Sequence, residues 1–156
     1  MINFANVLEA SRAAVGIRAP DKTGALKAAV RMLCAGDEKL DEDSLLSAII
    51  AREVVSSTGV GGGMAIPHAL LDGIERTSMA VMRLERPVAF DAPDGVPVDM
   101  VFMIAGPKKG TSGHLQLLSK LARVLHDPAF RKAAREAPDG PALARLLLER
   151  DRKSVV

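Results

Sequence analysis

A nearly unbroken apolar run, Val98 to Ala105, places the strongest constraint on the fold, because Asp99 is its only charged residue. Such a run is typical of a β-strand buried on both faces, since a strand with one face in water alternates apolar and polar residues. The sequence therefore predicts a central strand with packed elements on either side. Shorter strands are predicted at Met64–Ile66 and at Thr77–Leu84, the latter closed by Pro87.

Helical patterns before and after this strand can provide the packing elements. Each combines apolar residues at helical spacing with an Asp, Thr or Ser able to cap the first turn. The predicted helices run from Asp21 or Thr23 to Gly36, from about Asp41 to Arg52, from Thr111 or Ser112 to Leu125, from Asp127 to Arg135, and from Asp139 onward. The chain, 1–156, is predicted to be one domain, with a short lead-in helix within 1–20 and a frayed tail that includes 151–156.

The stretch from Ser56 to Leu70 combines backbone freedom with a reactive side chain. Its glycines at 59 and 61–63 permit conformations that a Cβ would forbid, and Pro67 restricts the backbone immediately before His68. Neither nucleotide-binding loop fits, because the spacing G-x-G-x-x-G is not completed and Gly-Lys-Ser/Thr is absent. Two interpretations remain: a loop whose amides approach a phosphoryl oxygen beside a nucleophilic histidine, or a surface turn followed by a structural histidine.

A second histidine and one arginine are further candidates. His114 lies in the first turn of the helix predicted from Thr111 or Ser112, on the same stripe as its buried leucines. The positive end of a helix favours a neutral imidazole and bound anions, although a histidine hydrogen-bonded in the core is an alternative. Arg52 lies in the last turn of the helix predicted from Asp41, where a cation suits the helix end with or without a further role.

Composition excludes several classes of function. The chain lacks Trp and Tyr, and its net charge is only +2 with both signs interspersed, so no nucleic-acid surface is expected. Its single cysteine, Cys34, excludes an internal disulfide. No apolar run is long enough to cross a bilayer, and the start lacks the pattern of a signal peptide. The expected location is the cytoplasm, without membrane insertion.

The motifs together resemble the enzyme IIA domains of the bacterial phosphoenolpyruvate-dependent phosphotransferase system, of the fructose/mannitol and nitrogen-regulatory type (type 2). The resemblance covers nearly the whole chain and departs from the family at Gly62, where many members have Asn. The residues that carry it are Arg52-Glu53, Ser57-Thr58-Gly59-Val60-Gly61, Ala65-Ile66-Pro67-His68, Leu84 to Ala92, Gly95 to Asp99, and His114-Leu115.

The resemblance implies an α/β fold, a single domain in which a mixed β-sheet is flanked by helices on both faces. It also implies a phosphocarrier, in which His68 accepts a phosphoryl group from a histidine-phosphorylated carrier protein, HPr or its nitrogen-branch counterpart. His114 and Arg52 would support the phosphorylated site without a metal or cofactor. Further phosphate contacts are expected from Thr58, Gly61, Gly62 and Gly63.

Different functions remain open beside this one. The nitrogen-regulatory type, in which the phosphoryl group alters affinity for a regulatory target protein, is favoured by the absence of an attached membrane or IIB-type segment. A fructose/mannitol component would instead pass the phosphoryl group to a IIB domain. The remaining alternative is a metal-dependent hydrolase that uses His68, His114 and Asp91 or Asp99, although the chain has no compact ligand motif such as H-E-x-x-H.

Overall fold

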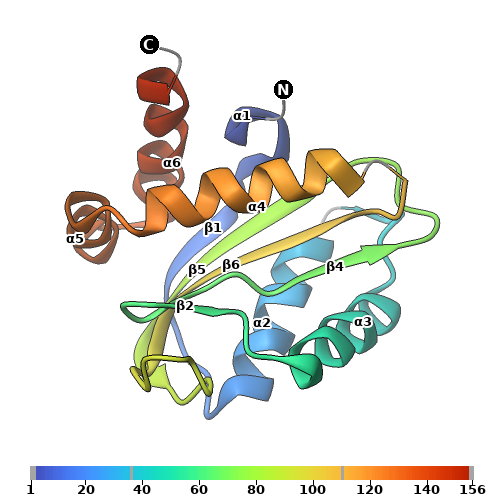
Figure 1. The fold of residues 1–156 in the computed structure, drawn as a ribbon, viewed down its shortest axis with the longest axis horizontal. Helices are drawn as coiled ribbons and strands as arrows, with labels where there is room; N and C mark the ends of the chain where they lie inside the picture. The colour runs from blue at the N-terminus through green and yellow to red at the C-terminus, as the bar shows by residue number, and fades with distance from the viewer. Residues whose placement is uncertain (1–2, 36, 110, 155–156) are drawn as a thin grey trace.

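A computed structural model describes residues 3–35, 37–109 and 111–154 (Figure 1). Within them, six strands form one sheet in the order β1-β5-β6-β3-β2, and β4 also pairs with β6. The strands are β1 (Leu8–Ile17), β2 (Gly59–Gly61), β3 (Met64–Ala65), β4 (His68–Leu71), β5 (Ser78–Val88) and β6 (Val98–Pro107). The helices are α1 (Phe4–Val7), α2 (Lys22–Cys34), α3 (Glu42–Val55), α4 (Thr111–Leu125), α5 (Pro128–Glu136) and α6 (Gly140–Ser154).

Strand β6 is the centre of the sheet, and the prediction of a strand buried on both faces is confirmed. Every residue from Val98 to Gly106 is buried except Asp99. Strand β5 pairs antiparallel with β6 on one side, while β3 and β4 pair parallel with it on the other. The two short strands lie in line along β6, with Met64 opposite Met100 and His68 opposite Ile104. The Pro67 carbonyl between them accepts a hydrogen bond from the Ile104 amide at 2.9 Å.

Helices cover both faces of the sheet and enclose two separate cores. In Figure 1, α4 and α6 lie above the strands, and α2 and α3 lie below them. The upper core joins α1, α4, α5 and α6 to one set of strand residues, among them Phe102 and Ile104. The lower core joins α2 and α3 to the alternate set, among them Val101 and Met103. The predicted α/β class, with a mixed sheet and helices on both faces, is confirmed.

Helix α2 begins as expected after Asp21, whose side chain accepts a hydrogen bond from the Gly24 amide. Helices α3 and α5 are likewise capped by Asp41 and Asp127. Residue 36, the predicted end of α2, lies outside the described residues. Helix α4 already begins at Thr111, so neither Thr111 nor Ser112 is its cap.

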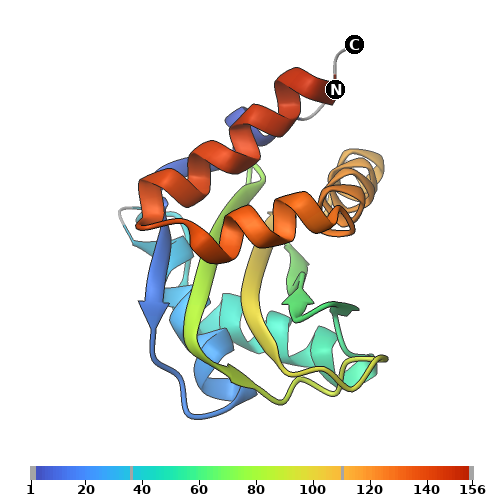
Figure 2. The same ribbon diagram turned by 90° about the vertical axis from the view of Figure 1, so that its left-hand side faces the viewer.

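Three expectations were wrong. Residues 8–17 form a strand at the sheet edge that pairs parallel with β5, whereas only a lead-in helix was expected, and that helix is confined to residues 4–7. Strand β5 continues through Pro87 to Val88. Helix α6 continues through residue 154, where a frayed tail was expected, and residues 155–156 of that tail lie outside the described residues. Asp151 accepts the Phe4 amide hydrogen at 2.7 Å and pairs with Lys120, which joins α6 to α1 and α4 (Figure 2).

None of the helices in the described part of the chain has both the length and the apolar character needed to cross a membrane.

Candidate functional site

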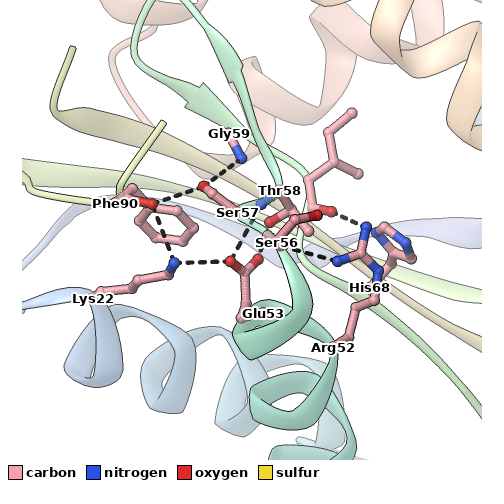
Figure 3. A network of polar contacts seen from close by, with 10 residues as sticks. Lys22, Arg52, Glu53, Ser56, Ser57, Thr58, Gly59, His68 and Phe90 are labelled. Carbon is pink, nitrogen blue, oxygen red and sulfur yellow. Dashed lines mark hydrogen bonds and ion pairs between the residues drawn. The ribbon is translucent and has the colours of Figure 1, made fainter. Parts of the chain in front are cut away.

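His68 is the first residue of β4, and its orientation is fixed by its own backbone. Its ring nitrogen Nδ1 lies 2.8 Å from the Ile66 carbonyl oxygen (Figure 3). A carbonyl oxygen can only accept, so Nδ1 carries the proton and Nε2 keeps the free lone pair. Pro67 stands between the two partners and restricts the backbone that joins them. The site therefore presents Nε2 as a nucleophile.

The surroundings of His68 favour its neutral form. Burial lowers the pKa of this half-buried imidazole, the hydrogen bond to Ile66 raises it, and the charge of Arg52 lowers it further. The net direction is downward from the ordinary value of 6.5. At neutral pH the ring is thus mostly uncharged, as a nitrogen nucleophile must be.

His114 lies beside His68, as the resemblance requires. The two ring centroids are 5.4 Å apart, with an angle of 53° between the planes. His114 is in the first turn of α4 and only 5% exposed, which confirms that it faces inward. Both of its ring nitrogens are buried and have no hydrogen-bond partner among the described residues. Buried polar atoms are nearly always satisfied, so this arrangement is suited to a ligand that approaches the histidine pair.

Burial also keeps His114 uncharged. It lowers the pKa of the imidazole from 6.5 to about 4, with a further contribution from His68. A neutral imidazole still has one N–H to donate, and the first-turn amides of α4 favour an anion nearby. His114 can therefore donate a hydrogen bond to an oxygen bound at His68 without itself being charged.

Arg52 supplies the positive charge of the site. It lies in the last turn of α3, and its Nη1 donates to the Ser56 carbonyl at 3.0 Å. Figure 3 shows the Arg52 guanidinium beside the His68 ring. This position agrees with the lowering of the pKa of His68 by the charge of Arg52. The hydrogen bond to Ser56 uses one of the five guanidinium donors. The structure therefore brings together the three residues predicted as the catalytic group.

A buried ion pair between Lys22 and Glu53, which the sequence did not indicate, fixes the backbone next to Arg52. Glu53 is 7% exposed, and its carboxylate pairs with Lys22 Nζ at 2.9 Å (Figure 3). The same carboxylate accepts hydrogen bonds from the amide and the hydroxyl of Thr58. Lys22 also donates to the Phe90 carbonyl at 3.1 Å. These contacts fix the segment between Arg52 and β2, and they commit the Thr58 hydroxyl to Glu53, whereas it was expected to contact phosphate.

The glycines at 61–63 are placed differently from the expected phosphate contacts. Gly61 ends β2, and Gly62 and Gly63 form the turn between β2 and β3, all with positive φ. Thr58, which pairs with Ile66 beside His68, is at the other end of this hairpin. The Gly62 amide donates to an Asp94 carboxylate oxygen at 2.9 Å, and Arg135 donates to the Gly62 carbonyl. The structure does not bring these glycines to the histidine pair.

The hydrolase alternative gains nothing from the arrangement of the acids. Asp99 is held by Arg135 through two contacts of 2.8 and 3.0 Å. Among the described residues, His, Cys, Asp and Glu side chains form no group of three or more that could hold a metal ion.

Exposed apolar side chains follow two of these residues in the sequence. Val54 and Val55, which come after Arg52 and Glu53 at the end of α3, are 80% and 79% exposed, and Leu115, which follows His114 in α4, is 59% exposed. Large apolar groups left in water beside a reactive centre are typical of a surface that contacts another protein.

Comparison with known families gives a match over nearly the whole chain. The model of the family described as phosphoenolpyruvate-dependent sugar phosphotransferase system, EIIA 2, matches residues 6–150. A nitrogen regulatory protein of Pseudomonas aeruginosa is 34% identical over 149 residues, covering 96% of this chain and 97% of that protein. The fructose-specific EIIA component of Haloferax volcanii is 34% identical over 128 residues, covering 82% and 83%.

Solved structures agree with this match. The nitrogen regulatory protein IIA-Ntr of Neisseria meningitidis superposes with a TM-score of 0.82 at 30% identity, covering 90% of this chain and 96% of that one. The mannitol IIA of Escherichia coli has a TM-score of 0.74 over 90% of this chain and 98% of that one, and at 21% identity it supports the fold alone.

Proposed function

Because the chain belongs to the type 2 EIIA family of the phosphoenolpyruvate-dependent sugar phosphotransferase system, we propose that His68 accepts the phosphoryl group on Nε2. The resemblance seen in the sequence is confirmed, and the chain is a phosphocarrier of this system. What supports the choice of atom is the hydrogen bond from Nδ1 to Ile66, which holds the proton away from the reacting nitrogen.

The transfer needs no acid or base on this chain. The lone pair of His68 Nε2 attacks phosphorus and forms a P–N bond, while the P–N bond to the donor histidine breaks and its electron pair returns to the donor ring. Nδ1 keeps its proton throughout, so proton and charge balance are maintained. Such transfers have loose transition states, and the protein acts by alignment and by stabilising charge on the equatorial oxygens.

His114 and Arg52 are the groups that would stabilise that charge. The observation that carries this role is the pair of unsatisfied ring nitrogens on His114, whose ring lies 5.4 Å from the ring of His68. A phosphoryl oxygen on His68 would give His114 the acceptor it lacks. Arg52 would contribute a charge-assisted hydrogen bond, which is shorter and stronger than a neutral one.

The donor is a histidine-phosphorylated carrier protein, HPr or its nitrogen-branch counterpart. The exposed Val54 and Val55 at the end of α3 and Leu115 at the start of α4 would contact this carrier protein. We assign the chain to the nitrogen-regulatory type, since the relatives named nitrogen regulatory protein reach 34% to 38% identity. The fructose-type relative, at 34%, favours a second candidate, onward transfer to a IIB domain.

The test is incubation with enzyme I, each carrier protein and labelled phosphoenolpyruvate. His68→Ala is expected to incorporate no label, and His126→Ala, at an exposed histidine, is the matched control and should incorporate as much as wild type. His114→Ala should remain folded and accept the label at least about tenfold more slowly. Label retained by His68→Ala would refute the assignment. Label passed onward to a IIB domain would favour the transport candidate.

A further inference from the structure

A polar cavity of about 600 Å³ is lined by residues that do not belong to the histidine site. It is lined by residues of β1, by residues on either side of residue 36 between α2 and α3, and by residues 74–78 at the start of β5. Its size falls in the range of small-molecule sites. The lining residues are Glu9, Arg12, Ala35, Asp37, Lys39, Leu40, Ile74, Glu75, Arg76 and Ser78.

The inner wall of this cavity holds a buried arginine that is incompletely paired. Arg12 is only 8% exposed, and its Nε is buried with no hydrogen-bond partner among the described residues. Its ion pair from Nη2 to Asp37 Oδ2 spans 3.7 Å, which is too long for a hydrogen bond. A buried guanidinium without an acceptor is costly. The Arg12 side chain keeps about a tenth of its surface exposed, so a ligand carboxylate in the cavity could accept a charge-assisted hydrogen bond from the accessible part of the guanidinium.

The charges around Arg12 restrict what that ligand can be. The lining carries three cationic and three acidic side chains, so the cavity is neutral as a whole. A simple anion would be repelled by the carboxylates of Asp37, Glu9 and Glu75. A simple cation would be repelled by the guanidinium of Arg12. A molecule with both charges close together matches both sets of groups.

We propose that this cavity binds a free α-amino acid, with its carboxylate on Arg12 and its ammonium group toward the acids Asp37, Glu9 and Glu75. The apolar part of the lining, Leu40 and Ile74, would contact the side chain. Lys39 and Glu75, which pair with each other at 3.6 Å, are largely exposed and form part of the rim.

The test is a titration of the full-length protein, followed through its backbone amide NMR signals. The probes are L-alanine, L-glutamine, L-glutamate and L-arginine, each to about 10 mM, and acetate, methylamine and inorganic phosphate at the same concentrations. At least one amino acid should give saturable shifts confined to residues near the cavity. Acetate, methylamine and phosphate should each bind at least about tenfold more weakly than that amino acid. Absence of saturable shifts with every amino acid, or equal binding of acetate or phosphate, would overturn the proposal.

The shifts should extend to Thr77, which lies between two lining residues. A Cβ added at Gly106 would be 3.0 Å from Thr77 Oγ1 and 3.7 Å from His114 Nδ1, so the Thr77 and His114 side chains both lie close to Gly106.

Variants then locate the binding. Arg12→Met should lower the affinity for the amino acid that binds best by at least about tenfold, because one charge-assisted contact is lost. Because Arg12 is buried, Arg76→Ala and Glu9→Gln at the exposed rim serve as second variants, and each should weaken binding measurably with an unchanged unfolding transition. Arg18→Ala, in an exposed ion pair with Glu85 outside the cavity, is the control and should bind as wild type does. Unchanged affinity in the rim variants would refute the site.

Discussion

The burial of His114 predicts that the protein loses stability as the pH falls from 7 to 5. The pKa of this imidazole is 6.5 in the unfolded chain and about 4 in the folded one. Between these values the unfolded chain binds a proton that the folded chain does not. The free energy of unfolding therefore decreases as the pH falls through this window, and the contribution of His114 is fully present only above about pH 6.5.

The size of the effect follows from the two pKa values. At pH 5 nearly all unfolded molecules carry the proton, whereas few folded ones do. The free energy of unfolding should then be lower by about 2 kcal/mol at pH 5 than at pH 7 from His114 alone. That is a sizeable part of the total stability of a small domain.

The assay is urea unfolding at both pH values for wild type, His114→Leu and His126→Gln. Leucine suits the buried position and cannot titrate, while His126 is an exposed histidine that serves as the control. Wild type and His126→Gln should both lose about 2 kcal/mol more than His114→Leu on acidification. The same loss in His114→Leu would show that His114 is not held neutral by burial, and would refute the reasoning.

Further predictions concern the supporting contacts. Lys22→Met leaves the Glu53 carboxylate buried without its cation and should lower the free energy of unfolding by about 3 kcal/mol, much of which a second substitution, Glu53→Gln, should restore. Gly63→Ala should lower the free energy of unfolding by about 2 kcal/mol, because φ is +79° and the new Cβ would lie 3.0 Å from Asp99 Oδ1. Gly73→Ala is the control: its φ is +84° but its Cβ would lie in open space, so denaturant unfolding should show a loss of only about 1 kcal/mol. Arg52→Gln should slow phosphoryl transfer by at least about tenfold, with little change in unfolding free energy.

The parts of the fold that the sequence predicts are those with a strong local pattern. The run in β6 and the aspartate caps of α2, α3 and α5 are of this kind. Strand β1 was missed because Ala, Ser, Arg and Gly dominate it and no apolar alternation marks it. Its pairing with β5 and the packing of α6 against it are long-range contacts, which a local pattern does not encode.

The candidate site was predictable in its residues and not in its geometry. Helical spacing placed His114 on an inner face, and Pro67 predicted a fixed direction for His68. Their separation depends on the register of β4 on β6 and on how α4 crosses the sheet, neither of which has a local signal. The glycine turn was recognised from its need for positive φ, but its partners Asp94 and Arg135 come from distant segments, and so its role was misassigned.

The central claim, that His68 Nε2 carries the phosphoryl group, is tested most directly by long-range ¹H–¹⁵N NMR of the histidine rings after phosphorylation by a carrier protein at alkaline pH. The account predicts that only His68 changes, with phosphorus coupled to Nε2 and the proton retained on Nδ1. A phosphoryl group on Nδ1 of His68, or on His114 or His126, would contradict it.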